Sequence, residues 1–168
     1  DYMKKITAGV LGPSGEAGWG DIDYDEYTNV AIGAQIVVSS TKSMALPPTL
    51  LNDNKMYTPD DNGWSPATAD TNPFIEVIFG VKTVVDTIKL YFGYDDPDTL
   101  VDYIPDYYKI EYYNYDTKTW VHLLTADALI APIEFTMTHG FSAVESSRIR
   151  FTLKQKSLQR WREIQVLG

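Results

Sequence analysis

The sequence contains no cysteine and only two histidines among its 168 residues. The absence of cysteine excludes disulfides, thiolate metal sites and a cysteine nucleophile. One of the two histidines, His122, lies beside Trp120 in a strand-like run, where a histidine with a structural role is the commoner case. The chain also lacks a Gly-x-Ser-x-Gly motif, a phosphate-binding glycine-rich loop and a His-Glu-x-x-His motif. These absences predict a protein that performs no catalysis itself.

Positive charge and long apolar runs are also scarce. The chain has 14 Lys and Arg residues against 23 Asp and Glu residues, which gives a formal net charge of −9. No stripe of Lys and Arg reverses this charge locally, so the sequence disfavours binding to nucleic acid or to an anionic membrane. No apolar run is long enough to cross a bilayer, and no apolar signal segment follows residues 1–5. Because the chain begins with Asp and ends at Gly168 just after a strand-like run, we expect a domain of a longer protein, whose secretion signal, if it has one, lies outside this sequence.

The chain is rich in aromatic and β-branched residues. Its 12 Tyr, four Trp and six Phe residues, with many Val, Ile and Thr residues, favour packing across a pleated sheet. Strand-like runs recur between turn-forming residues, and the polar turn at residues 114–118 predicts a hairpin. Eight short strands without a convincing amphipathic helix predict an all-β fold, a jelly-roll β-sandwich of antiparallel strands. The expected strands are residues 34–40, 74–79, 84–91, 107–113, 120–123, 133–137, 148–153 and 163–167.

The chain divides into a short irregular segment and one domain. Residues 1–28 are rich in glycine and acidic residues, and they are interpreted as an irregular lead-in or linker. Residues 29–168 have the length of a single domain with one core. Two long loops, residues 41–73 and 92–106, interrupt the expected strands. Binding sites are usually built on such loops when a rigid sandwich supports them.

A series of short motifs between residues 29 and 168 resembles the discoidin, or coagulation factor type C, domains and the family 32 carbohydrate-binding modules. Each motif is a common β pattern, but at least seven of them occur in the order typical of the family. The resemblance implies a galactose-binding-domain-like sandwich, often attached to secreted glycosidases or adhesins. The matching segments are residues 29–40, 50–54, 63–64, 73–80, 85–90, 105–110, 120–121, 147–151 and 162–168.

The resemblance also implies a structural Ca²⁺ site between the loop after the first strand and the last strand. Hard cations bind about six to eight oxygens, supplied by carboxylates and main-chain carbonyls. Two features depart from the family pattern, because Asn54 replaces a usual glycine and Lys55 replaces a residue whose side chain often binds the ion. Alternatively, the loop only forms a turn and the glutamate lies on an exposed strand face. The matching positions are Leu50, Asp53, Lys55, Thr58 and Glu163.

The resemblance implies a sugar site where residues 92–106 meet residues 154–162. A sugar ring packs its C–H face on a flat aromatic side chain while polar groups bind its hydroxyls. Trp161 with Arg160 is the most attractive pair, although Trp161 could equally seal the end of the sandwich, and Trp64 is expected in the core. The candidate ligand-binding residues are Tyr94, Asp95, Asp98, Tyr103, Arg160 and Trp161.

Two functions follow from this resemblance. The first is a non-catalytic carbohydrate-binding module that targets an attached enzyme or adhesin to a glycan, outside the cell or at its surface. The polar triad of galactose-binding members is absent, however, because Ser65 follows Trp64 where those members have His, and residues 92–101 contain neither Arg nor Asn. This absence favours the alternative, a protein-interaction or structural module that packs against a neighbouring domain of its parent protein.

Overall fold

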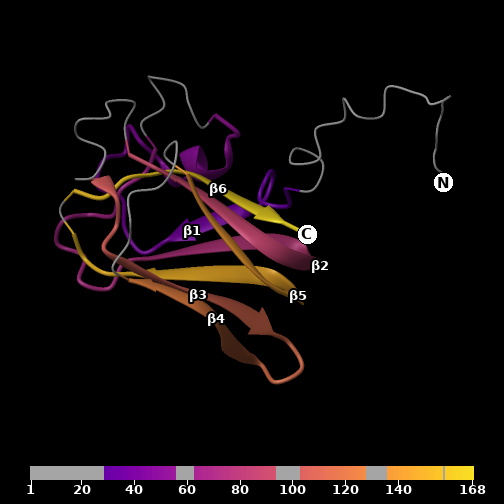
Figure 1. Ribbon diagram of the computed structural model, residues 1–168. Helices are drawn as coiled ribbons and strands as arrows, with labels where there is room; N and C mark the ends of the chain where they lie inside the picture. The colour runs from indigo at the N-terminus through magenta and orange to yellow at the C-terminus, as the bar shows by residue number, and fades with distance from the viewer. Residues whose placement is uncertain (1–28, 56–62, 94–102, 128–135, 157) are drawn as a thin grey trace, which may run out of the picture.

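The computed structural model describes residues 29–55, 63–93, 103–127, 136–156 and 158–168 (Figure 1). One helical element, the 3₁₀ helix η2 (Pro48–Asn52), and six strands make up its regular structure. No helix in the described ranges is long and apolar enough to cross a membrane. The all-β prediction is confirmed. The strands are β1 (Gln35–Val38), β2 (Phe74–Phe92), β3 (Tyr107–Asn114), β4 (Thr119–Asp127), β5 (Thr136–Leu153) and β6 (Trp161–Leu167).

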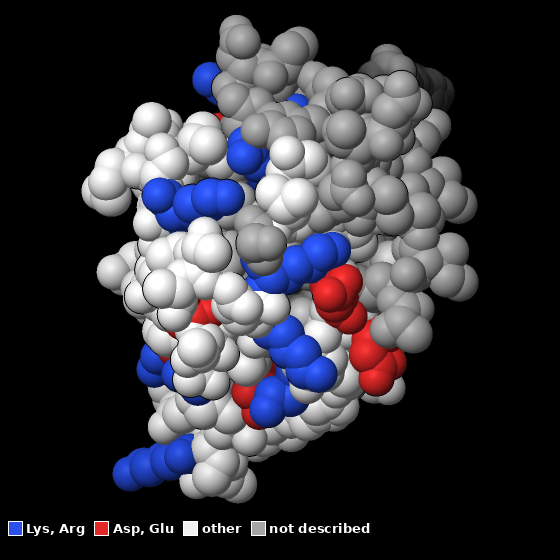
Figure 2. Space-filling view, turned by 90° about the vertical axis from the view of Figure 1, so that its left-hand side faces the viewer, with Lys and Arg blue, Asp and Glu red and all other residues white. Residues whose placement is uncertain are grey.

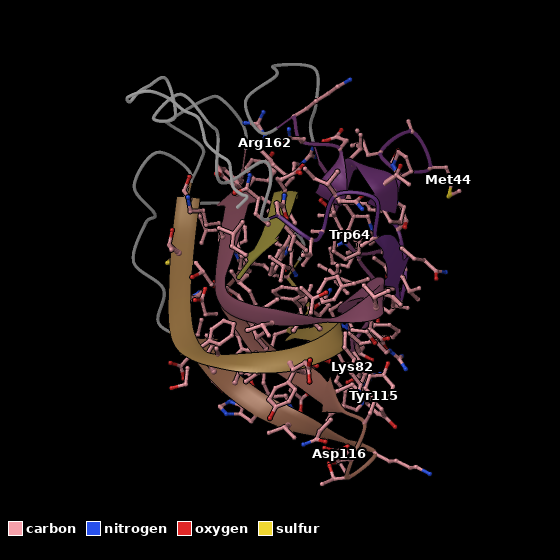
Figure 3. All side chains as sticks on the ribbon, turned by 90° about the vertical axis from the view of Figure 1, so that its right-hand side faces the viewer. Met44, Trp64, Lys82, Tyr115, Asp116 and Arg162 are labelled. Carbon is pink, nitrogen blue, oxygen red and sulfur yellow. The ribbon has the colours of Figure 1, made fainter. Side chains whose placement is uncertain are left out.

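All strand pairs are antiparallel, in the order β1-β2-β5-β3-β4, with β6 paired to β2. The first part of β2 pairs with β1 and the second part with β6, while β5 follows β2 along both parts. Figures 1 and 3 show these two long strands curving between the two parts. The continuous sheet thus folds over itself into the two layers of a sandwich.

The strand count differs from the prediction of eight. The expected strands 74–79 and 84–91 are one strand, β2, and the expected strand 148–153 is the second part of β5. Turn-forming chemistry around Gly80 suggested a break, but β2 continues through it with a register shift between Ile78 and Thr83. Gly80 adopts a φ of 86°, which a residue without Cβ tolerates. A bend therefore stands where a turn was predicted.

The hairpin predicted around residues 114–118 is confirmed, with Tyr113 opposite Trp120 and Asn114 opposite Thr119. The Asn114 side chain accepts hydrogen bonds from the main-chain N–H groups of Asp116 and Thr117. Lys118 closes the turn with a φ of 58°. Such local side-chain bonds are the reason why Asn favours turns.

The core lies between the two layers and is dominated by large aromatic side chains. Trp64, Phe92, Tyr108, Phe151 and Trp161 are all fully buried. The burial of Trp64 agrees with its predicted place in the core. Truncation of such a residue typically costs about 3–5 kcal/mol, so this cluster contributes a large share of the stability.

The start of the described chain is tied to the last strand. The Asn29 Oδ1 atom accepts hydrogen bonds from the N–H groups of Ala31 and Val166, at 3.1 and 3.0 Å. Val30 N also donates to the Val166 carbonyl at 2.9 Å. Residue 29 is therefore already part of the sandwich, whereas the lead-in expected at residues 1–28 lies outside the described residues.

Candidate functional site

The loop that precedes β3 and the loop that precedes β6 meet at one end of the sandwich. The N–H of Arg160 donates to the Tyr103 carbonyl at 2.9 Å, and the Arg160 carbonyl accepts from Gly93 N at 3.0 Å. Tyr103 and Arg160 belong to the two segments, residues 92–106 and 154–162, that were predicted to converge. The described residues of the two segments converge as predicted. We call this surface the loop end, and it comprises Tyr103, Asp106, Tyr107, Lys154, Lys156 and Arg160.

A third loop is fixed to the same end by main-chain hydrogen bonds. Trp64 and Trp161 exchange two of them, at 2.7 and 2.8 Å, and the Ser65 hydroxyl donates to the Gln159 carbonyl at 2.6 Å. Gly63 makes this approach possible, because a Cβ there would lie 2.3 Å from the Trp161 carbonyl oxygen. Gly63 also has a φ of 73°, where other residues are strained. The loop is therefore held rigidly against the start of β6.

Two cation–aromatic pairs line the loop end. The Arg160 guanidinium lies 5.6 Å from the centre of the Tyr103 ring, and the Lys154 ammonium lies 4.6 Å from that of Tyr107. Lys156 binds the segment between the two tyrosines, because its ammonium donates to the Ile104 carbonyl and lies 3.2 Å from the Asp106 carboxylate. Figure 2 shows Lys and Arg side chains gathered on this face, although the chain is acidic as a whole. The end thus presents flat rings beside hydrogen-bond donors.

Only part of the predicted ligand site can be placed. Tyr103 and Arg160 lie together, as predicted, and both are half-buried. Tyr94, Asp95 and Asp98 lie outside the described residues. Lys154, Lys156 and Tyr107 were not among the predicted ligand-binding residues, although Lys154 and Lys156 lie in the loop 154–162 that was expected at this end. Tyr107 is the first residue of the strand that follows the loop 92–106, and this position is the signal that could have identified it.

The platform role predicted for Trp161 is wrong, because this side chain is fully buried. Its ring packs edge-on against Phe92, with centroids 4.9 Å apart, and also against Tyr108 and Phe151. Its indole N–H donates to the Gln159 side-chain oxygen at 3.2 Å. The structure therefore agrees with the alternative interpretation, in which Trp161 seals the end of the sandwich from inside.

The predicted cation loop lies directly over the last strand. Glu163 is fully buried, and its Oε2 atom accepts a hydrogen bond from Asn54 N at 2.9 Å. Asn54 has a φ of 64°, so it adopts the conformation for which the family pattern uses glycine. The Glu163 side chain does not lie on an exposed face, contrary to the alternative weighed from the sequence.

The residues present fit a hard cation through oxygen donors. Among the described residues no three His, Cys, Asp or Glu side chains cluster closely enough to hold a metal. A Ca²⁺ ion would therefore be bound by main-chain oxygens of Leu50 and Lys55 together with the carboxylates of Glu163 and Asp53. Oxygen ligands of these two kinds are the ones that Ca²⁺ prefers. The Asp53 Oδ1 atom already accepts from Lys55 N at 3.0 Å, which turns the chain within the loop. Thr58 lies outside the described residues.

The outer face of the sheet carries a charged cluster that the sequence analysis missed. Both Glu76 oxygens are bound, one by Arg148 at 2.6 Å and the other by Arg150 at 2.7 Å. Burial raises the pKa of Glu76, but the hydrogen bonds and charges of the two arginines outweigh it and lower the pKa below its usual value. Both guanidinium groups lie over the ring of Trp120, at 5.3 and 4.3 Å. The Arg-x-Arg alternation of residues 148–150, facing a glutamate on the next strand, is the sequence signal of this cluster.

The two histidines have structural surroundings. The Tyr108 hydroxyl and His139 Nε2 lie 2.5 Å apart, and burial raises the pKa of Tyr108 and lowers that of His139. Both groups are therefore uncharged near neutral pH. His122 is exposed and bonds only to Thr125 among the described residues. Tyr108 is fully buried, so its hydrogen bond with His139 belongs to the packing of the core.

The folded-over antiparallel sheet, with loops gathered at one end, defines an antiparallel β-sandwich. Residues 35–164 match the F5/8 type C domain family, so the chain belongs to this family, also called discoidin domains. No curated protein sequence matches the chain significantly.

Solved structures share the fold at low sequence identity. The family 32 carbohydrate-binding module of C. perfringens NanJ, solved with galactose, has a TM-score of 0.67 and 15% identity over 84% of this chain and 98% of its own. Chitosan-binding module 2 of a Paenibacillus sp. IK-5 chitosanase/glucanase, solved with chitotriose, has a TM-score of 0.65 and 16% identity over 83% and 100%. The lectin domain of lectinolysin, solved with Lewis B antigen, has a TM-score of 0.65 and 21% identity over 83% and 95%. These likenesses establish the sandwich fold.

Proposed function

We propose that the chain is a non-catalytic carbohydrate-binding module whose loop end binds a glycan. The observation that carries the proposal is the pair of tyrosines, Tyr103 and Tyr107, each beside a cation from the facing loop. A tyrosine ring offers a flat face to the C–H surface of a sugar, while Arg160 and Lys154 donate to its hydroxyls. Tyr94, Asp95 and Asp98 remain part of the proposed site on the basis of the sequence.

The comparisons support this proposal from two sides. Several structures that share the fold hold sugars, namely galactose, chitotriose and Lewis B antigen. Other matches are small parts of larger chains, since the fold covers 29% of SpGH29 and 27% of a Ruminococcus gnavus GH29 fucosidase. A module of this kind, attached to a glycoside-active enzyme or adhesin outside the cell, raises the effective concentration of its partner at a glycan.

Galactose specificity of the usual type is not part of the proposal. Ser65 stands where galactose-binding members have a histidine, and its hydroxyl is already used to bond the Gln159 carbonyl. Ser65 is also buried, with 8% of its surface exposed. This position therefore fixes a loop and offers no hydroxyl-binding group to a ligand.

We also propose a structural Ca²⁺ ion at the loop of η2. The position of the Glu163 carboxylate supports the proposal, because its hydrogen bond from Asn54 N places it directly against the loop whose oxygens would complete the site. Leu50, Asp53, Lys55 and Thr58 would complete the set with main-chain and carboxylate oxygens. When bound, the ion supplies a fixed positive charge that holds the loop on β6.

A protein-interaction module is the second candidate function. The outer-face cluster of Trp120, Tyr113, Arg148 and Arg150 favours it, because these residue types dominate the energetically important parts of protein interfaces. Both arginine side chains keep about a third of their surface exposed, at 33% and 31%. A partner domain of the parent protein would pack on this face of the sheet.

A glycan array with matched variants tests the first proposal. We expect retention on a subset of glycans, with binding weakened about tenfold or more in Tyr103→Ala and Arg160→Ala, since one lost sugar contact is worth roughly 1.4 kcal/mol. Lys118→Asn is the control, because it removes an exposed cation from the far hairpin and Asn tolerates the φ of 58° there. No binding to a broad panel, or equal binding by all variants, would reject the loop-end site and leave the interaction module.

A further inference from the structure

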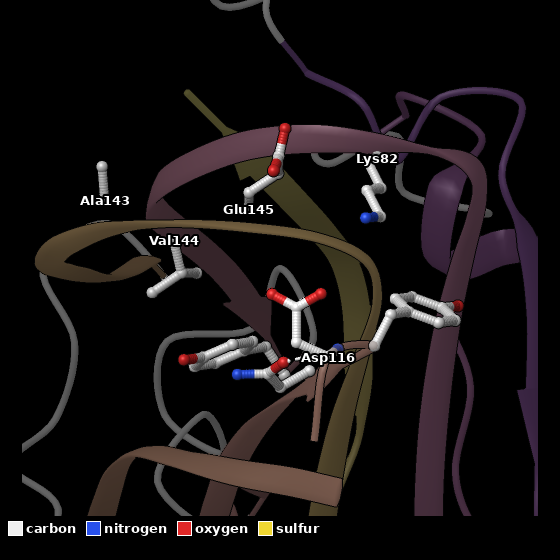
Figure 4. Close-up of a pocket in the computed structure, with 8 residues that line it drawn as sticks. Lys82, Asp116, Ala143, Val144 and Glu145 are labelled. Atoms are coloured by element: carbon white, nitrogen blue, oxygen red, sulfur yellow. Dashed lines mark hydrogen bonds between the residues drawn. The ribbon is translucent and has the colours of Figure 1, made fainter. Parts of the chain in front are cut away.

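A cavity of about 250 Å³ opens at the end of the sandwich opposite the loops. Three segments supply its walls: the bend of β2, the turn between β3 and β4, and the bend of β5 (Figure 4). The lining residues are Lys82, Tyr112, Asn114, Tyr115, Asp116, Ala143, Val144 and Glu145. We call this cavity the hairpin-end pocket.

Aromatic and aliphatic side chains give the pocket an apolar wall. Tyr115 is 39% exposed, but its ring is held in place because its hydroxyl bonds the Ser147 hydroxyl at 2.7 Å and Tyr113 packs edge-on against it at 4.6 Å. Tyr112 and Val144 are half-buried beside it. The wall therefore combines exposed ring area with little side-chain freedom to lose on binding.

The charged groups of the pocket are available to a ligand. Lys82, Asp116 and Glu145 are exposed, and within the described part of the chain their charged groups form no ion pair. Figure 4 shows the Lys82 amine and the Asp116 carboxylate facing the same space. Asn114 uses its oxygen for the hairpin turn, which leaves its NH₂ group as a further donor. The pocket thus offers donors and acceptors side by side.

This mixture points to a ligand with hydroxyl groups and no net charge. Two carboxylates disfavour an acidic ligand, and the Lys82 ammonium disfavours an amine, whereas hydroxyls both donate to carboxylates and accept from an ammonium. The volume lies below the range of about 300–1,000 Å³ that suits drug-sized ligands, so it suits a single ring. We propose that the hairpin-end pocket is a second carbohydrate site that binds one uncharged pyranose residue.

The pocket is separate from the loop end. Tyr107 and Asn114 are the first and last residues of β3, and seven steps of about 3.3 Å place them roughly 23 Å apart. In Figure 3, Lys82, Tyr115 and Asp116 lie together at the edge of the molecule away from Arg162. The inference stands on the pocket's own chemistry and does not require sugar binding at the loop end. With both sites occupied, one module would hold two glycan branches at once.

Nuclear magnetic resonance titration of the full chain separates the two sites. The probes are the methyl glycosides of galactose, glucose, mannose and fucose, with glucosamine and glucuronic acid as charged comparators. We expect at least one neutral glycoside to shift the amide signals of residues 82, 114–116 and 143–145 in a saturable manner. Shifts at residues 103–107 and 154–160 report the loop end independently, so failure of one site is distinguishable from failure of the other.

Two exposed-site variants complete the test. Lys82→Ala and Asp116→Asn should each weaken the binding measured at the pocket about tenfold, and both should leave the loop-end signals unchanged. Asp86→Asn, which removes an exposed carboxylate from β2 outside the pocket lining, is the matched control and should bind as the wild type does. Absence of saturable shifts at the pocket with every neutral glycoside would overturn the proposal, as would a response to the charged comparators alone.

Discussion

The loop end and the hairpin end both combine tyrosines with charged side chains, but they are built differently. At the loop end, Lys156 is bonded to Ile104 and Asp106, and the loops themselves are fixed by main-chain hydrogen bonds to the start of β6. At the hairpin end, two of the three walls are strands that continue through bends, and Lys82 and Asp116 have no ion-pair partner among the described residues. The loop end is therefore held by bonds between its loops and β6, whereas the hairpin end is supported mainly by the bends of the two long strands.

Trp161 connects the loop end to the core. Its main chain binds Trp64, its ring lies among Phe92, Tyr108 and Phe151, and its neighbour Arg160 lies over Tyr103. A change in the packing of Trp161 is thus transmitted to the loops through a few bonds. The hairpin end meets the core differently, because Tyr112 and Val144 of the pocket pack against it, while the ring of Tyr113 packs edge-on against Tyr115 and Trp120.

The largest effect is expected from Trp161→Ala. Loss of this buried ring should lower the free energy of unfolding by about 3–5 kcal/mol, measured by urea denaturation. Hydrogen exchange should accelerate by local opening at residues 63–65 and 159–162, and the turn at residues 114–118 should keep its exchange rate. Trp161→Phe, which retains part of the volume, should show the same pattern with a smaller loss. Equal acceleration at both ends would show that the two ends are not independent.

A smaller effect is expected from the proposed Ca²⁺ ion. At a concentration of about one hundred times its dissociation constant, the ion should stabilise the fold by roughly 2.7 kcal/mol, and EDTA should remove this gain in a thermal melt. Hydrogen exchange should report added protection at residues 50–55 and none at the hairpin end. Glu163→Gln should abolish the response to Ca²⁺, while Asp86→Asn should retain it. A melting temperature that is the same with Ca²⁺ and with EDTA would reject the site.

The sequence predicted the strands and the hairpin because their signals are local. Alternation marks residues 107–113, and the Asn114 side chain closes the turn that its type favours. The convergence of Tyr103 with Arg160 also followed from the sequence, through the family pattern. These features depend on neighbouring residues or on the order of motifs, so the sequence alone is sufficient to predict them.

The sequence did not predict the burial of Trp161 or the length of the long strands, because both depend on pairing between distant segments. Simple alternation would put Trp161 on the face opposite Ile164 and Val166, yet all three lie in the core. The reason is a register shift in which Tyr91 faces Glu163 while Phe92 faces Trp161, so that β6 advances two residues against one in β2. The bend of β2 around Gly80 was missed for the same reason. The register shift at this bend is a property of the pairing between β2 and β5, which are far apart in the sequence.

The smallest effect is expected on the outer face, where Glu76 supports the hairpin end. Glu76 holds Arg148, whose guanidinium lies 5.5 Å from the centre of the Tyr113 ring, and Tyr113 in turn packs against Tyr115 of the pocket. Glu76→Gln should lower the free energy of unfolding by roughly 1–2 kcal/mol near neutral pH, because charge-assisted hydrogen bonds are replaced and the arginines are partly screened by solvent. Glu111→Gln, on the same face and paired only with Lys109 at 3.7 Å among the described residues, is the control and should cost less than about 0.5 kcal/mol.

The pH dependence of this difference identifies its cause. The pKa of Glu76 is lowered in the folded state, so the unfolded chain binds the proton first as the pH falls. The stabilisation from Glu76 is therefore complete above the usual glutamate pKa near 4.5, and it is lost as the pH falls through the lower pKa of the folded state. Urea denaturation of wild type and Glu76→Gln should then give free energies that converge as the pH falls below 4.5. A difference that stays constant with pH would mean that Glu76 acts through packing, and the hairpin end would then have no electrostatic support from this residue.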